Sequence, residues 1–189
     1  RHPVGDRVDD PADAPPHARE FAFIGDAAFR LLLAQPVHLA QDLGQARASQ
    51  ECANADTEPT AANLREIRAA ILCLHNQIRA ERGLPLLKEN ARLRRAASAH
   101  SADMVSRGFF EHTTPNGVTM VDRIMASRYA SPRVGWAFGE NLAWGTGGLA
   151  TPRAIMKAWM DSPGHRANVV KRTYREIGIG VVTGVPSDR

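Results

Sequence analysis

The fold and the candidate site are both organised around the stretch Phe138-Gly139-Glu140-Asn141-Leu142-Ala143-Trp144-Gly145. It is read together with His112, which lies 28 positions before Glu140, and with His165, which lies 25 positions after it. Glycine and asparagine flank Glu140, and Pro163-Gly164 precedes His165, so these side chains are expected on turns or loops. Loops held by rigid neighbours commonly carry binding and catalytic groups, and the three residues therefore form the candidate site.

The length and the charge of the chain limit its class. The 189 residues suit one domain, or one domain with an extension, and no apolar run is long enough to span a bilayer. Residues 1–59 hold 5 Lys/Arg and 10 Asp/Glu, whereas residues 60–189 hold 19 and 10. A basic folded domain favours anionic partners such as phospholipid or cell-wall polymer. No recognition-helix motif or aromatic stacking platform supports nucleic acid as a partner.

The N-terminal part predicts an extension rather than a domain. Residues 1–59 are expected to be mostly disordered or linker, because the first 20 are rich in Pro, Asp and Arg and have no periodicity. An apolar patch followed by Ala46-Arg47-Ala48 is either a remnant secretory segment at about residues 30–48 or a marginal helix in a linker. The folded domain is predicted to occupy residues 60–189.

Apolar residues recur at steps of three and four after residue 60 and again after residue 90, so the sequence predicts two amphipathic helices. Asn63 with Glu66 is predicted to cap the first helix, and Gly83 to end it. The second is expected to begin after Asn90 and to end at Gly108. His100 shares its apolar face with leucine and methionine and is predicted to be a packed, hydrogen-bonded histidine.

The remainder alternates short helices with short strands. Thr119 with Asp122 resembles a capping box for a third helix that runs to about residue 128, and Thr151-Pro152 is a favourable start for a fourth. Residues 142–144 predict a short strand, and the alternation of residues 177, 179 and 181 with small residues predicts a half-buried strand. The pattern indicates an α+β, layered architecture.

Taken together, these segments resemble the CAP superfamily, also called the SCP domain, which includes cysteine-rich secretory proteins, antigen 5 and pathogenesis-related protein 1. Six blocks match in the family's order over roughly residues 62–182, and the Ser-Pro-Gly-His-Arg form is similar to the bacterial branch. The blocks are Leu74-His75-Asn76-Gln77-Ile78-Arg79 with Gly83-Leu84-Pro85, His100-Ser101-Ala102-Asp103-Met104, Phe110-Glu111-His112, residues 139–145, residues 159–168, and Ile177-Gly178-Ile179-Gly180.

The resemblance implies a three-layer α-β-α sandwich with a small antiparallel sheet, and a central cleft lined by two histidines and acidic residues. His112, Glu140 and His165 match the family's cleft positions. A further glutamate of animal and plant members has no match, although Ser162 falls near its position and Asp161 is adjacent. These two and Asn141 are interpreted as supporting residues. The family's last strand is also unmatched, so either the sequence is truncated or its sheet is one strand short.

The two cysteines, Cys52 and Cys73, permit one disulfide but do not require it, and two idle thiols are the alternative. A bridge would fasten the polar lead-in, which is residues 49–59, to the first helix. The pair also resembles one in secreted actinobacterial members. With that resemblance it implies a secreted, extracellular protein.

Two imidazoles and one carboxylate suit Zn²⁺ or another divalent metal, which could polarise water or simply order the cleft. In a metal-free alternative, Glu140 bridges His112 and His165 through hydrogen bonds. No nucleophile can be assigned, so no catalytic residue is named, although Glu140 would be the base of a hydrolase. Three functions stay open: a secreted, monomeric binding module for lipid, sterol or cell-wall polymer; a metal-dependent hydrolase of peptide or envelope polymer; and a non-catalytic interaction domain.

Overall fold

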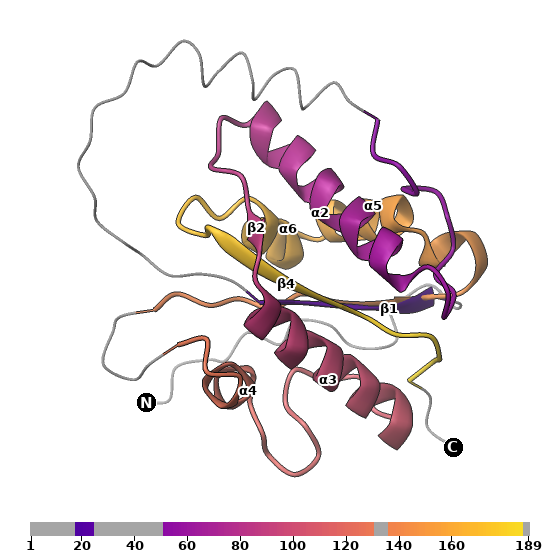
Figure 1. Ribbon diagram of the computed structural model, residues 1–189, viewed down its shortest axis with the longest axis vertical. Helices are drawn as coiled ribbons and strands as arrows, with labels where there is room; N and C mark the ends of the chain where they lie inside the picture. Colours follow the sequence, from indigo (N-terminus) through magenta and orange to yellow (C-terminus); the bar gives the residue numbers. More distant parts are fainter. Residues whose placement is uncertain (1–17, 25–50, 131–135, 187–189) are drawn as a thin grey trace.

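The computed structural model describes residues 18–24, 51–130 and 136–186, which form three layers (Figure 1). A four-stranded sheet lies between α2, α5 and α6 on one side and α3 and α4 on the other. Within these residues, no helix is both long and apolar enough to cross a membrane. The elements are β1 (Ala18–Ile24), α2 (Leu64–Glu81), β2 (Lys88–Glu89), α3 (Ala91–Arg107), α4 (Met120–Ala126), β3 (Leu142–Gly145), the 3-10 helix η2 (Gly147–Ala150), α5 (Pro152–Asp161), α6 (Pro163–Val169) and β4 (Glu176–Val181).

The sheet has the order β2-β4-β1-β3. β1 runs antiparallel to both β3 and β4, while the two-residue β2 is parallel to β4. The predicted α-β-α sandwich with a small sheet is confirmed, and β2 adds one short parallel pair to an otherwise antiparallel arrangement.

The strand β1 was not predicted, since residues 1–59 were expected to be mostly disordered or linker. In the structure Phe21 pairs with Ala143 on one side and with Val181 on the other, so β1 is a central strand. Both partner strands lie far away in the sequence, and no turn signal links them to β1. The pattern around residue 21 therefore contained no local evidence of its pairing. The secretory segment or linker helix expected within residues 25–50 lies outside the described residues.

The strand β4 is buried on both faces, so the prediction that it is half-buried was wrong. Ile177, Ile179 and Val181 pack into the core beneath α2 and α5. On the opposite face, Gly178 and Gly180 lie directly against the backbone of α3. The alternation of large and small residues therefore reflects close helix packing on the glycine face and not exposure to solvent.

Local signals set most of the helix ends. The side chain of Asn90 accepts hydrogen bonds at the start of α3, Gly108 ends this helix with φ +66°, and the Thr119–Asp122 capping box begins α4, all as predicted. Asn63 precedes α2 but does not cap it by its side chain. Its Oδ1 accepts from the Thr60 amide instead, and this bond holds the turn before the helix.

Two links fasten the lead-in to the helices on one side of the sheet. Cys52 and Cys73 form a disulfide that joins the lead-in to α2. Arg153 of α5 pairs with Asp56 through two nitrogens at 2.8 Å, and its backbone amide donates to the carbonyl of Ala55. The bridge expected from the resemblance is therefore present. It closes a loop between residues 52 and 73 and restricts the unfolded chain.

Acid is expected to destabilise the fold through His75 of α2. The ring is 2% exposed, its Nδ1 donates to the carbonyl of Ile71, and it packs edge-on against Trp159. Burial, as the main cause, and the nearby charge of Arg79 together lower the pKa of His75 from 6.5 to about 3, against the opposing effect of the hydrogen bond to Ile71. Because the unfolded chain takes up the proton first, the stability from neutral His75 is complete above pH 6.5 and lost between 6.5 and 3, by at most about 5 kcal/mol.

Urea unfolding at a series of pH values checks this expectation. The variant His75→Gln is the control, because glutamine can still donate a hydrogen bond but does not titrate. Its stability should fall less steeply with acid than that of the natural protein. Equal slopes for the two proteins would assign the acid sensitivity to other groups.

Candidate functional site

The carboxylate of Glu140 is the buried centre of the site. Its side chain is 2% exposed, whereas that of His112 is 55% exposed. His112 Nδ1 lies 2.9 Å from Glu140 Oε1, and since a carboxylate only accepts, Nδ1 is the donor. Two of the three predicted site residues are thus in direct contact, although they lie on different segments of the chain.

Arg123 of α4 is a partner of Glu140 that the sequence did not point to. Its Nη2 lies 2.9 Å from Oε1 and 2.8 Å from Oε2, so one nitrogen bridges both carboxylate oxygens. Its Nη1 donates to the carbonyl of His112 at 3.0 Å and to that of Val118 at 3.2 Å. The arginine side chain is 9% exposed. Arg123 therefore neutralises the buried carboxylate and also fixes the loop that carries His112.

His165 lies on a helix and not on the predicted loop. Ser162 and Pro163 end α5 but also begin α6, because proline at the first helical position is compatible with a new helix. His165 Nδ1 is 2.9 Å from Ser162 Oγ. Asn141 Nδ2 donates to the carbonyl of His165, so the residue after Glu140 contacts the backbone of α6.

The supporting residues have distinct surroundings. Asn141 is 2% exposed, and its Oδ1 accepts from Asn168 Nδ2 at 2.8 Å. The same Asn168 nitrogen also donates to the carbonyl of Glu140 at 3.3 Å. Asp161 instead forms an exposed ion pair with Lys157 on the same helix. Asn141 therefore joins the segment of Glu140 to α6, whereas Asp161 faces solvent and has no contact with this network among the described residues.

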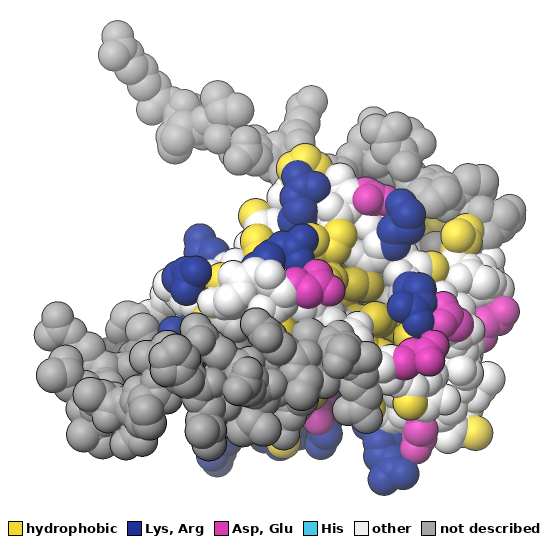
Figure 2. Space-filling view, turned by 90° about the horizontal axis from the view of Figure 1, so that it is seen from above, with side chains coloured by type: hydrophobic (Ala, Val, Ile, Leu, Met, Phe, Trp, Pro, Cys, Tyr) yellow, Lys and Arg dark blue, Asp and Glu magenta, His cyan; other side chains and the backbone are white. Residues whose placement is uncertain are grey.

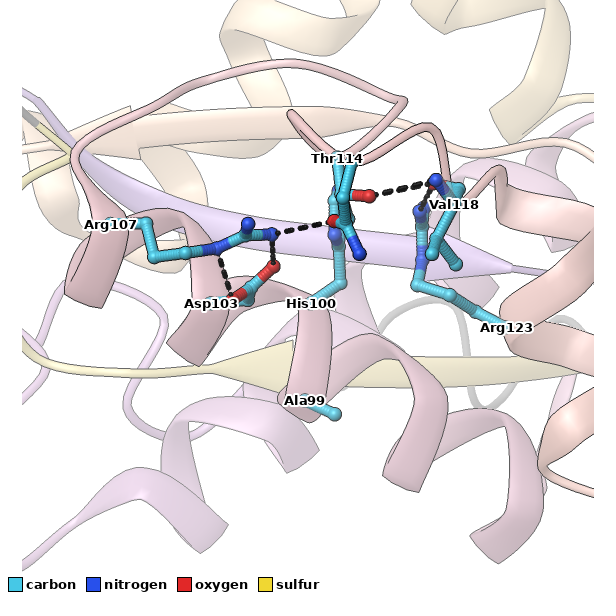
Figure 3. A pocket seen from close by; sticks show the side chains of 8 residues that line it. Ala99, His100, Asp103, Arg107, Thr114, Val118 and Arg123 are labelled. Carbon is cyan, nitrogen blue, oxygen red and sulfur yellow. Dashed lines mark hydrogen bonds and ion pairs between the residues drawn. The ribbon is translucent and has the colours of Figure 1, made fainter.

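A pocket of about 510 Å³ opens beside Arg123, between α3 and the loop that follows it (Figure 3). In that view Arg107 and Arg123 lie on either side of His100. Arg107 pairs with Asp103 on α3 and also donates to Asn116 Oδ1. We call this the α3 pocket, lined by Ala99, His100, Asp103, Arg107, Thr114, Asn116, Val118 and Arg123.

His100 is a packed, hydrogen-bonded histidine, as predicted. It is 1% exposed, and its Nε2 donates to the carbonyl of Glu111 at 2.9 Å, which fixes the tautomer. Burial lowers its pKa, and the charge of Arg123 lowers it further. Among the described residues, His100 Nδ1 and Arg123 Nε are both buried without a hydrogen-bond partner. The sequence placed His100 on the core face but gave no sign that it also lines a pocket.

Comparison with known families decides the identity of the fold. Residues 72–188 match the model of the CAP family, described as the cysteine-rich secretory protein family. The chain belongs to this family. This CAP domain is 36% identical over 109 residues to the uncharacterized protein YkwD of Bacillus subtilis (strain 168), a match that covers 58% of the chain and 40% of YkwD.

Two other bacterial proteins are also similar to this chain. The domain is 29% identical over 111 residues to the uncharacterized membrane protein YlbC of B. subtilis, covering 59% of the chain and 30% of YlbC. It also resembles the crystal structure of an extracellular protein containing an SCP domain from Bacillus anthracis, with a TM-score of 0.53, 28% identity, and coverage of 68% of this chain and 42% of that one. The chain thus spans less than half the length of each of these relatives.

The predicted metal site stays a prediction for this CAP domain. Within residues 18–24, 51–130 and 136–186, no group of three or more His, Cys, Asp or Glu side chains is arranged to hold a metal ion. His112 is hydrogen-bonded to Glu140, but Arg123 donates hydrogen bonds to both oxygens of the same carboxylate. The metal-free alternative had Glu140 bridging two histidines. In the structure Glu140 bridges His112 and Arg123.

Proposed function

We propose that this CAP domain is an extracellular binding module for anionic groups of the cell envelope, and that the α3 pocket holds such a group. The main support is the excess of hydrogen-bond donors in the pocket wall. Arg107 Nη1 and Asn116 Nδ2 make no hydrogen bond within the described residues, while both oxygens of Asp103 already accept from Arg107. Unused donors beside two guanidinium groups favour carboxylate or phosphate oxygens.

The charge on the visible α2 side of the molecule is mixed in sign. Figure 2 looks onto the α2 side of the molecule and shows Lys and Arg interspersed with Asp, Glu and hydrophobic side chains. No single-sign patch dominates the part of that face left uncovered by grey residues. The helix α3, which carries Arg107, lies on the other side of the sheet (Figure 1), and the α3 pocket beside it is lined by both Arg107 and Arg123.

An extracellular location is part of the proposal. The Cys52–Cys73 disulfide supports it, because such bridges persist mainly in oxidising compartments. The B. anthracis relative is described as extracellular. Phospholipid headgroups and cell-wall polymers both carry anionic oxygens, so the experiment must separate these two sources.

The test measures co-sedimentation of the protein with purified cell walls, with phosphatidylglycerol vesicles and with phosphatidylcholine vesicles. Arg107→Gln is expected to weaken binding by about tenfold or more, the usual range for loss of a charge-assisted hydrogen bond. Asp103→Asn should tighten binding, because it removes the carboxylate that competes for Arg107. Arg82→Gln is the matched control, since Arg82 is similarly exposed, pairs with a neighbouring glutamate, and lies just after α2, away from the α3 pocket.

The outcomes separate the candidate functions. Binding to cell walls alone would identify a wall polymer, and binding to phosphatidylglycerol alone a lipid headgroup. Release of soluble wall fragments would favour a hydrolase. Equal losses for Arg107→Gln and Arg82→Gln would remove the α3 pocket from the proposal, and no binding to any of the three would favour a purely structural domain.

A further inference from the structure

The negative charge of Glu140 is already paired with a cation, the side chain of Arg123. Arg123 Nη2 contacts both carboxylate oxygens at 2.8–2.9 Å, and both side chains are at least nine-tenths buried. A guanidinium group is permanently charged at any physiological pH. The negative charge of Glu140 is therefore neutralised inside the protein without any bound ion.

Arg123 is also held firmly in that position. Its Nη1 donates to the carbonyls of His112 and Val118, which lie on the loop before α4. The capping box of Thr119 and Asp122 fixes the start of the same helix. Moving the guanidinium away from Glu140 would thus break contacts with the loop as well as with the carboxylate.

The donor set that remains is a poor fit for a divalent metal. A ligating histidine must offer a lone pair, and His112 Nδ1, the ring nitrogen that faces Glu140, carries a proton that it donates to Oε1. Only Nε2, on the opposite side of the ring, keeps a lone pair, so His112 and Glu140 cannot share one ion through the atoms that face each other. A ligating carboxylate must offer free lone pairs, but three hydrogen bonds from Arg123 and His112 surround Glu140. A dication at this carboxylate would also face the fixed charge of the guanidinium at short range.

We propose that Arg123 replaces a metal ion as the cation of this cleft, so that the His112–Glu140 pair is organised without metal. Arg123 is a positioning residue in this role, because it acts through Glu140 and the His112 loop. The proposal does not depend on which ligand enters the α3 pocket. It predicts a difference in metal binding between variants, which a merely structural role would not produce.

The experiment measures zinc content by mass spectrometry after dialysis, and the melting temperature with and without ZnCl₂. The natural protein should retain much less than one zinc ion per molecule, and ZnCl₂ should not change its melting temperature. Arg123→Met should take up zinc and gain thermal stability from it, because the carboxylate is freed and the repelling charge is gone. Arg123→Lys keeps a cation and should again exclude zinc. The double variant Arg123→Met with Glu140→Gln should not take up zinc, because it lacks the carboxylate.

Two results would overturn the proposal: stoichiometric zinc on the natural protein, or a folded Arg123→Met variant that takes up no zinc. If Arg123→Met does not fold, the natural protein and Arg123→Lys still decide the question, since zinc bound to either one contradicts a cationic side chain that takes the place of the metal. Neither result depends on envelope binding through Arg107, so failure here is distinguishable from failure of the proposed function.

Discussion

Replacing Gly178 or Gly180 by alanine is expected to lower the free energy of unfolding by about 3 kcal/mol each, enough to reduce the melting temperature by roughly 6–12 °C. A Cβ at Gly180 would lie 2.5–2.6 Å from backbone atoms of Ala97 and Ser98, and one at Gly178 would collide with the backbone of Leu93 and Arg94. Backbone within a helix cannot turn aside as a flexible side chain can. The added methyl group must therefore push α3 away from the sheet.

Thermal unfolding of the two variants checks this expectation, and Gly148→Ala provides the control. A Cβ at Gly148 would meet nothing within 4 Å, and this glycine has an ordinary backbone conformation, so the change should stay within about 0.5 kcal/mol. Melting temperatures of Gly178→Ala and Gly180→Ala equal to that of the control would contradict the close packing of α3 on β4.

Loss of the Arg79 guanidinium is expected to have the second largest effect. Arg79 of α2 is fully buried, and its three nitrogens hold four main-chain carbonyl oxygens. Arg79→Met would remove all four of these charge-assisted hydrogen bonds, and those to Val169 and Tyr174 lie in buried surroundings, so the cost should be about 4 kcal/mol or more. The acceptors, at 2.8–3.0 Å, belong to Pro85, Val169, Lys171 and Tyr174, and they join the chain after α2 to the end of α6 and the segment that follows it.

Chemical denaturation of three variants separates charge from geometry. Arg79→Lys keeps the charge but lacks the planar fork, so it should lose nearly as much stability as Arg79→Met. Arg82→Met removes an exposed arginine three residues later on the chain and should change stability by no more than about 0.5 kcal/mol. A lysine variant as stable as the natural protein would show that charge, and not the hydrogen-bond pattern, is what the site requires.

The parts of the fold that the sequence predicted correctly are those with local causes. Asn90 and Gly108 bound α3 because a cap needs only neighbouring amides and a left-handed turn. Thr119 begins α4, and Thr151 caps α5, for the same reason. The contact between His112 and Glu140 was anticipated on different grounds, since it followed from the resemblance of whole blocks to the CAP family.

The missed features depend on tertiary structure. Pro163 can follow a helix or begin one, and the sequence did not show that Ser162 serves both α5 and α6. Arg123 is one of many arginines, and only the approach of α4 to the Glu140 segment distinguishes it. The resemblance of the blocks therefore predicted that the segments of His112 and Glu140 meet, but it did not predict that Arg123 neutralises the carboxylate.

The central position of β1 has a consequence for synthesis of the chain. Phe21 emerges from the ribosome well before its partners Ala143 and Val181, because both follow it at a long distance in the sequence. Such long-range pairing closes a large loop and slows folding. Until then the segment Phe21-Ala22-Phe23-Ile24 is an apolar strand with both edges unpaired, which is a hazard for aggregation. Nascent chains of this protein are therefore expected to need a chaperone that shields this segment until β3 and β4 have been made.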